Sequence, residues 1–362
     1  MKQTGFYMIL DNIDWLQRRL AAWYETHRRD LPWRHTRNPY RIWVSEIILQ
    51  QTQVAQGLDY YRRFVEQFPT VEALAAATQD DVLKVWQGLG YYSRARHLHE
   101  SAQLIMERFG GRFPTKYADV MSLKGVGEYT AAAICSFAYR QPYATVDGNV
   151  YRVLARYFGL YMPIDTTEGK RLFAQVAQTL LDTRQPDVHN QALMEFGALQ
   201  CTPVAPRCDD CPLHDHCAAL RGQCVDVLPR KQGTKRVRDR YFYYFFILID
   251  DKTFLHQRGA HDVWQGLYEF PLLELAQPIG VEKLLRKAEV TDLIGNGGYE
   301  LVHVSPVKKH VLSHQRIFAQ CLTVKCVART EALAGYTELP LSALSDFPIS
   351  RLMDRLIADA QK

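Results

Sequence analysis

The pattern of apolar residues changes abruptly near residue 230, and this change limits the possible folds more than any other feature. Before it, apolar residues recur at helical spacing, as they do along 13–24. After it, they form short runs typical of strands, beginning with 241–249. Between them, 227–240 contains six Lys or Arg residues and one Asp. We therefore expect an all-α region at 1–226, a basic linker, and an α+β domain at 241–362.

Composition gives expectations about location and charge. The apolar run 6–10 is too short for the core of a signal peptide, and no run is long enough to span a bilayer. We therefore expect a cytoplasmic protein, in the cytosol or nucleoid, with no membrane partner. The net charge of +5 is mild, so binding to nucleic acid would depend on local basic patches and directed contacts.

Cysteine spacing points to a metal site. Four of the eight cysteines fall within seventeen residues, and these are Cys201, Cys208, Cys211 and Cys217. Four thiols on short loops suit zinc or an iron–sulfur cluster, whereas disulfides are not expected without a secretory signal. Because His214, His216 and Cys224 lie close enough to act as alternative zinc ligands, the residues alone leave the metal open.

A short turn, Gly125-Val126-Gly127, separates two stretches of helical character, 116–123 and 129–137. Glycine at both ends of the turn permits positive φ, because it adopts such angles without steric cost. The uncovered N–H groups of the turn, at the start of the second helix, could then bind a DNA phosphate. An ordinary turn between two helices is the alternative.

Two carboxylates are candidate catalytic groups. Glu46 is a single acid among apolar residues, and burial there would raise its pKa and let it donate a proton near neutral pH. An exposed helix glutamate is the alternative. Asp147 precedes an amphipathic helix, so N-capping by Asp147 or Asn149 is the default role.

Candidate DNA contacts lie in the loops of the helical region. Arg29 and Arg34 occupy a basic loop, beside a tryptophan that we expect to be buried, and suit phosphates or bases. Gln51 belongs to a cluster of amides that could probe base edges or fill a vacated base stack. Tyr91 follows two glycines and could act as a wedge. For each of these, plain packing or solvation is the alternative.

Several of these segments together carry a resemblance to a known family. They read LPWR at 31–34, SEIILQQT at 45–52, GLGYYSRAR at 88–96, LKGVGEYTA at 123–131 and VDGNVYRVLAR at 146–156, followed by the four spaced cysteines. This order is similar to the MutY family of adenine DNA glycosylases, in the helix-hairpin-helix superfamily. The resemblance implies an all-α catalytic region with its hairpin at 116–137 and a 4Fe-4S cluster in the loop 201–217.

The implied activity is base-excision repair by a monomeric enzyme on double-stranded DNA. It would flip out adenine mispaired with 8-oxoguanine or guanine, hydrolyse the N-glycosidic bond and leave an abasic site. Glu46 matches the general acid and Asp147 the carboxylate that stabilises the cationic sugar, which is the two-carboxylate logic of glycoside hydrolysis. Tyr129 matches a tyrosine that supports the pair, and Asn149 lies in the same motif. Gln51 and Tyr91 match residues that fill and wedge the base stack.

Two other kinds of protein share part of this pattern. An endonuclease III type glycosylase would need a Schiff-base lysine where Tyr129 stands, so a monofunctional glycosylase is expected. A zinc-stabilised DNA-binding protein without catalysis would also fit the hairpin and the cysteines.

The C-terminal part resembles the Nudix-like domain of the same family. We expect 241–249 and 254–257 to form a hairpin, later strands at 299–304, 308–312 and 315–324, and helices at 281–288 and 350–360. True Nudix hydrolases bind magnesium through a glutamate-rich helix, whereas 281–288 holds one glutamate. A binding role is therefore expected.

The turn 310–314 is the expected site of lesion recognition. The family has a Phe-Ser-His run here, which Ser313 and His314 match, whereas Leu312 departs from it. The Ser313 hydroxyl could bond the ring N–H or oxygen that distinguishes 8-oxoguanine. His310 and Leu312 would flank this contact, and a plain polar hairpin turn is the alternative.

Overall fold

The computed structural model describes residues 13–233 and 237–360 of the 362-residue chain. Contacts group the chain into two compact units, Met1–Ala75 with Glu100–Thr234, and Ala76–His99 with Lys235–Lys362. The apolar run 6–10 and the linker residues 234–236 lie outside the described residues. The division at 227–240 stays a prediction, although the contacts add 76–99 to the C-terminal half and the first strand already begins at Arg238.

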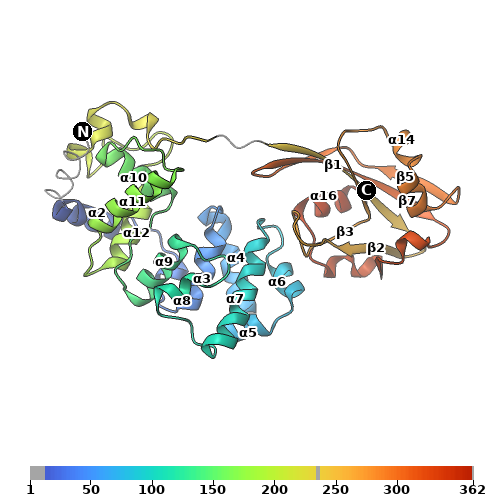
Figure 1. Cartoon of the computed structure of the whole chain (residues 1–362), viewed down its shortest axis with the longest axis horizontal. Helices are drawn as coiled ribbons and strands as arrows, with labels where there is room; N and C mark the ends of the chain where they lie inside the picture. Colours follow the sequence, from blue (N-terminus) through green and yellow to red (C-terminus); the bar gives the residue numbers. More distant parts are fainter. Residues whose placement is uncertain (1–12, 234–236, 361–362) are drawn as a thin grey trace. The chain divides into compact units, whose positions relative to one another are not determined.

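The N-terminal half of the chain is helical, as expected (Figure 1). Its α-helices are α2 (Ile13–His27), α3 (Pro39–Leu49), α4 (Val54–Gln67), α5 (Val71–Ala76), α6 (Gln79–Val85), α7 (Ser93–Phe109), α8 (Tyr117–Met121), α9 (Glu128–Tyr139), α10 (Gly148–Phe158), α11 (Thr167–Leu180), α12 (Pro186–Leu199) and α13 (Ala218–Arg221). Short 3-10 turns are η1 (Pro32–Arg34), η2 (His214–His216) and η3 (Val225–Val227).

Helix α10 shows how the sequence produces the helical core. Its apolar residues Val150, Val153 and Leu154 recur at helical spacing and pack with α2, α11 and α12 around Phe173 and Phe196. Burying each such side chain contributes roughly 1.5–3 kcal/mol. This packing holds the start of α10, which carries Asp147, at a defined place in the fold.

The predicted helix–turn–helix at 116–137 is present, with one correction to the length of its first helix (Figure 1). The first helix is shorter than expected and spans only Tyr117–Met121. Gly125 has φ +72°, whereas Gly127 has φ −98° and caps α9 in an extended conformation, so only one glycine needs left-handed backbone. Gly127 supplies no side-chain cap, which leaves the first N–H groups of α9 without one.

The C-terminal part is the expected α+β domain, built on a larger and a smaller sheet (Figure 1). The larger sheet has the order β4-β1-β7-β5, with β6 also paired to β7, and the smaller has the order β3-β2-β8. The strands are β1 (Arg238–Leu248), β2 (Lys252–Gln257), β3 (Tyr268–Glu269), β4 (Leu272–Leu275), β5 (Tyr299–Val304), β6 (Lys308–Val311), β7 (Gln315–Cys326) and β8 (Thr337–Pro340). The helices are α14 (Val281–Leu285), α15 (Ala288–Ile294) and α16 (Arg351–Ala360), with 3-10 turns η4 (Glu331–Leu333) and η5 (Leu341–Asp346).

The expected hairpin between 241–249 and 254–257 is wrong. Only one bridge, Ile249 to Lys252, joins the two segments, and the strands then diverge. β2 instead pairs antiparallel with β8 from near the end of the chain, while β1 pairs parallel with β7 and antiparallel with β4. These partners are distant in sequence, so the local turn signal could not reveal them.

Other local expectations hold in part. β6 and β7 form the expected hairpin, with Val311 paired to Arg316. The segment predicted as one helix at 281–288 ends at Leu285, and a second helix starts at Ala288. No helix in the described part of the chain combines the length and apolar character needed to cross a membrane.

Candidate active site

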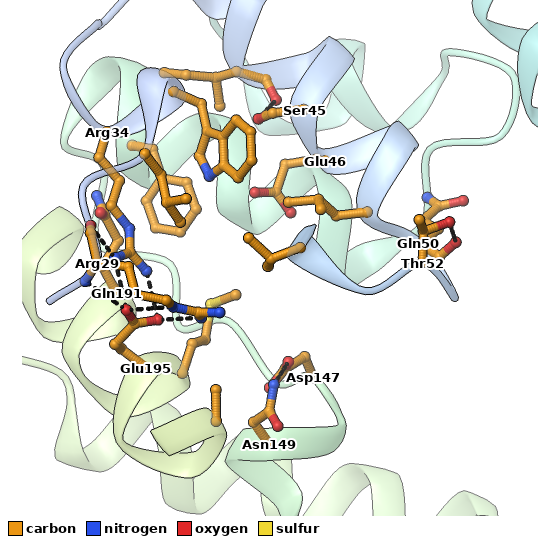
Figure 2. A pocket seen from close by; sticks show the side chains of 18 of the residues that line it. Arg29, Arg34, Ser45, Glu46, Gln50, Thr52, Asp147, Asn149, Gln191 and Glu195 are labelled. Atoms are coloured by element: carbon orange, nitrogen blue, oxygen red, sulfur yellow. Dashed lines mark hydrogen bonds and ion pairs between the residues drawn. The ribbon is translucent and has the colours of Figure 1, made fainter. Parts of the chain in front are cut away.

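A cavity of about 420 Å³ in the first unit brings together all three predicted catalytic residues (Figure 2). Its polar lining comes from Arg29, Arg34, Ser45, Glu46, Gln50, Gln51, Thr52, Tyr129, Asp147, Asn149, Gln191 and Glu195. In the view of Figure 2, the two arginines and Glu195 lie on one side and Gln50 and Thr52 on the other, with Glu46 and Asp147 between them.

Glu46 is held inside the protein by its own helix. From Tyr40 to Ile48 nearly every residue of α3 is buried, so an acid in this stretch has no exposed face to occupy. Glu46 is only 6% exposed, and this burial raises the pKa of its carboxyl to about 7. The Tyr129 hydroxyl, which donates to Glu46 Oε2 at 2.9 Å, and the Arg34 charge act in the opposite direction. The result is a carboxyl poised to exchange a proton near neutral pH.

Asp147 lies at the N-terminus of α10, and it rather than Asn149 is the N-cap. Its Oδ1 accepts from the Val150 N–H at 2.8 Å, and its Oδ2 accepts from the Asn149 side-chain amide at 2.7 Å. Burial raises the pKa of Asp147, while these hydrogen bonds pull it back down. The ionised Asp147 also raises the pKa of Glu46, so the two carboxyls are electrostatically coupled.

Tyr129 comes from the first turn of α9, directly after the glycine turn. Burial, reinforced by the nearby acids Glu46 and Asp147, raises the pKa of Tyr129 well above its ordinary value. Its hydroxyl therefore stays protonated and acts as a donor to Glu46. On the same helix Thr130 accepts from the Gln50 amide at 3.2 Å, which ties the end of α3 to α9.

Glu195 is a site residue that sequence reasoning missed. It lies on α12, its side chain is 1% exposed, and it binds the guanidinium groups of both Arg29 and Arg34. The four side-chain hydrogen bonds run from 2.5 to 2.9 Å, and they outweigh burial and lower the pKa of Glu195 to about 2. The two arginines therefore have an internal partner, and any contact with DNA stays a prediction. A lone acid in an apolar helical stretch, the signal that singled out Glu46, would also have found Glu195.

The other predicted DNA contacts lie at tight turns. Gln51 has φ +57°, is exposed and lines the cavity. Tyr91 belongs to the second unit, where it has φ +49° and is 50% exposed. In the hairpin Gly125 and Gly127 are exposed, whereas Val126 is buried. The tryptophan expected to be buried beside Arg34, Trp33, is only partly so and lines the cavity. Their contacts with DNA stay predictions.

The four spaced cysteines line one small cavity of about 30 Å³, together with Arg156 and His214. Arg156 Nη1 lies 3.4 Å from Cys201 Sγ, and burial raises the pKa of Cys211 to about 12. Within 13–233 and 237–360, no three His, Cys, Asp or Glu residues lie close enough to hold a single metal ion. The donor set of four converging thiols with a nearby guanidinium still fits a multi-iron cluster, because a cluster separates its ligands more than one ion does and favours their thiolate form.

The turn predicted to read the lesion is a tight hairpin turn in the second unit. The Leu312 N–H donates to Gln315 O at 2.8 Å, and the Arg238 N–H donates to His314 O at 3.1 Å. Ser313 and His314 are exposed and lie in hydrogen-bond contact with each other at 3.1 Å. Leu312 packs against the domain core instead, and the His310 ring packs edge-on against a tryptophan, Trp264. Lesion reading by this turn stays a prediction.

Comparison with known proteins gives consistent matches for both halves. Residues 44–178 match the HhH-GPD superfamily of base excision DNA repair proteins, and residues 243–359 match the NUDIX domain. A protein of Buchnera aphidicola subsp. Baizongia pistaciae named adenine DNA glycosylase is 32% identical over 303 residues, which cover 83% of either chain. The adenine DNA glycosylase of Rattus norvegicus is 43% identical over 212 residues, covering 56% of this chain and 41% of that one. The solved structure of a thermostable thymine-DNA glycosylase matches 59% of this chain and 98% of its own, with a TM-score of 0.55 and 30% identity.

Proposed function

The chain belongs to the adenine DNA glycosylase family of base-excision repair enzymes, and from this premise we propose that it excises adenine mispaired with 8-oxoguanine or guanine. The observation that carries the proposal is the carboxyl of Glu46, buried beside the cavity, with a pKa of about 7 and with Asp147 lining the same cavity. Glu46 can then donate the proton that cleavage of a glycosidic bond requires, and the hydrogen bonds that Asp147 accepts from Val150 and Asn149 favour the ionised form of the second carboxyl.

We propose that Glu46 protonates the flipped adenine at N7. Because burial raises the pKa of Glu46 to about 7, its carboxyl can carry the proton near neutral pH. As the proton moves to N7, the bond between N9 and the sugar carbon C1′ breaks, and its electron pair leaves with the adenine. The sugar is left as an oxocarbenium-like cation, which the carboxylate of Asp147 stabilises by its charge. Water then adds to C1′ and its proton passes to the Glu46 carboxylate, which restores the acid, and an abasic site remains.

The cavity lining supports hydrolysis without strand cleavage. A lyase forms a Schiff base between a lysine amine and the sugar. No lysine lines the cavity among the residues that the structure describes, and Tyr129 stands at the position where such a lysine would be needed. The nearby Lys124 is exposed and lies 3.8 Å from Glu100 Oε2. We therefore propose a monofunctional glycosylase.

We propose that Cys201, Cys208, Cys211 and Cys217 hold a 4Fe-4S cluster. When bound, the cluster would crosslink the loop 201–217, which has little regular structure of its own. Arg156 supports this loop by donating to Thr202 O at 2.7 Å and to Pro203 O at 3.3 Å. A zinc ion is the second candidate, and iron content together with colour separates the two.

The proposed substrate is double-stranded DNA, bound by a monomer in the bacterial cytosol or nucleoid. The amides that line the cavity and the exposed turn at Gly125 support contacts with the strand that holds adenine. The exposed Ser313 and His314 would contact the opposing 8-oxoguanine.

The proposal is tested by single-turnover adenine release from duplexes with adenine opposite 8-oxoguanine, guanine, cytosine or thymine. Base release is scored separately from strand scission. Glu46→Gln and Asp147→Asn should each nearly abolish release and leave mispair binding largely intact, because both remove what only the transition state needs. Glu107→Gln, which neutralises an exposed acid outside the cavity, is the matched control. Near-normal release by either cavity variant would contradict the role given to that residue.

A further inference from the structure

The turn that presents Tyr91 has an unusual backbone, which other contacts must hold. Gly88 and Gly90 have φ values of +92° and +80°, and Tyr91 itself has φ +49°. Positive φ is uncommon for a bulky residue and costs free energy unless the surroundings enforce it. Because half of the Tyr91 side chain is exposed, its own burial does not explain why this conformation is kept.

Part of the support comes from the same segment. The Trp86 indole N–H donates to Gly90 O at 3.1 Å, and the Arg94 guanidinium donates to the same carbonyl at 3.0 Å. The Arg94 guanidinium also lies 5.4 Å from the centre of the Tyr91 ring, within the range of a cation–π contact. These contacts hold the turn at Gly90.

At Gly88, the turn is linked to the C-terminal domain through Tyr92. Its side chain is buried, and its hydroxyl accepts from the Gly88 N–H at 3.0 Å. The same hydroxyl donates to Ile349 O at 3.4 Å, and the Ile349 N–H donates to Gln87 Oε1 at 3.4 Å. One phenol therefore links the first glycine of the turn to the segment just before α16.

This link belongs to a wider contact within the second unit. Asp80 accepts from the Tyr268 hydroxyl at 3.0 Å, and Arg96 donates to Gln265 O at 2.7 Å. Lys84 donates to the carbonyls of Ser345 and Phe347. Residues on both sides of the turn are therefore fastened to the C-terminal domain, and this explains why contacts group 76–99 with that domain.

We infer that Tyr92 is a positioning residue, through which the C-terminal domain holds Tyr91 in the conformation needed to wedge the base stack. The inference rests on the proposed function, in which Tyr91 acts as that wedge. The C-terminal domain then has two tasks, since it both contacts the lesion strand and orders the residue that assists extrusion of adenine. Loss of the domain would slow base flipping as well as weaken lesion preference.

The test measures base extrusion separately from chemistry. A duplex with the fluorescent adenine analogue 2-aminopurine at the target position reports extrusion as a rise in fluorescence, because unstacking relieves quenching. Tyr92→Phe keeps the ring and removes the hydroxyl, so the turn loses its hydrogen bond at the Gly88 N–H. Extrusion should then slow about fivefold, the factor that corresponds to one neutral hydrogen bond. Tyr268→Phe is the matched control, since its hydroxyl serves the same contact but bonds Asp80 and not the turn. It should keep the normal rate, and the midpoint of thermal unfolding should show that both variants are folded.

A double-mutant cycle shows whether Tyr92 acts through Tyr91. In a Tyr91→Ala background, Tyr92→Phe should cause no further slowing, because the residue that it positions is gone. If Tyr91→Ala slows extrusion, three results would overturn this inference and leave the proposed function standing. They are a normal rate for Tyr92→Phe, additive effects of the two substitutions, and equal slowing by Tyr268→Phe. A normal extrusion rate for Tyr91→Ala would overturn the wedge role itself, and the inference with it.

Discussion

Replacing Tyr129 with phenylalanine should shift the pH dependence of adenine release. The reaction uses the protonated form of Glu46, so its rate should fall as pH rises through about 7, the pKa of that carboxyl. The Tyr129 hydroxyl donates to Glu46 Oε2 at 2.9 Å and so favours the ionised carboxylate. Without this donor the carboxylate is less stable, the pKa of Glu46 rises further, and the alkaline decline moves to higher pH.

The size of the shift follows from the hydrogen bond that is lost. A hydrogen bond to a charged group contributes roughly 1.5–3 kcal/mol. One pKa unit corresponds to about 1.4 kcal/mol, so the decline should move upward by about one to two units. Glu46 is nearly fully buried, and water therefore replaces the lost donor poorly. We expect a shift near the lower end of this range, because a small rotation of the carboxyl can recover part of the lost hydrogen-bond energy.

The assay is single-turnover adenine release, measured across the neutral and alkaline range and normalised to each protein's own maximum. Normalisation matters because Tyr129→Phe will also lower the maximal rate if the hydroxyl helps the chemistry directly. Tyr143→Phe is the control, since the ring of that residue stacks on Tyr117 and does not line the cavity.

The reasoning fails if Tyr129→Phe leaves the decline where it is, or moves it to lower pH. An unmoved decline would mean that another group, or a step other than proton donation by Glu46, limits the rate above neutral pH. An equal shift in Tyr143→Phe would mean that the effect does not arise from the bond between Tyr129 and Glu46.

Three further predictions concern stability, the metal and the lesion. Glu46→Gln should raise the free energy of unfolding by up to about 3 kcal/mol above pH 7 and by little below pH 4.5. The pKa of Glu46 is raised in the folded state, so ionisation of this carboxyl destabilises the folded protein as pH rises from 4.5 to 7. Urea unfolding at the two pH values measures the difference. Cys211→Ser should lose bound iron and weaken DNA binding. Cys224→Ser, whose thiol lies outside the cysteine cavity, should keep both the iron and the normal affinity for DNA. A fully active iron-free protein would exclude the cluster. The double substitution Ser313→Ala with His314→Ala should lower the preference for 8-oxoguanine over guanine several-fold, because each lost hydrogen bond costs about 1 kcal/mol. Competition between duplexes that carry the two bases measures this preference, and an unchanged value would place lesion recognition elsewhere.

Features set by a few neighbouring residues could be predicted from the sequence. The turn between α8 and α9 falls where Gly125 permits a positive φ, and Asp147 caps the helix that follows it. The hairpin turn predicted at 310–314 is also present, although β6 continues to Val311 and the turn is confined to 312–314. In each case the backbone hydrogen bonds and dihedral angles that define the feature lie within about four residues. The local sequence is therefore enough to predict it.

Features that depend on distant segments could not be predicted in this way. The sequence left open whether Glu46 faces water or the interior, and only the packing around α3 decides it. The ion pairs of Arg29 and Arg34 with Glu195 join residues more than 160 positions apart. Their strength depends on the exclusion of water, which no local pattern records.

The amino-acid sequence is therefore enough to give the order of the elements, the acids and cysteines available for chemistry, and the family to which the chain belongs. Tertiary structure alone decided that Glu46 has a pKa near 7, that β2 pairs with β8, and that 76–99 contact the C-terminal domain. The physical reason is one of range. Dihedral preferences and capping act over a few residues, whereas a pKa, a strand partner and a contact between distant segments depend on which parts of the chain fold together and displace water.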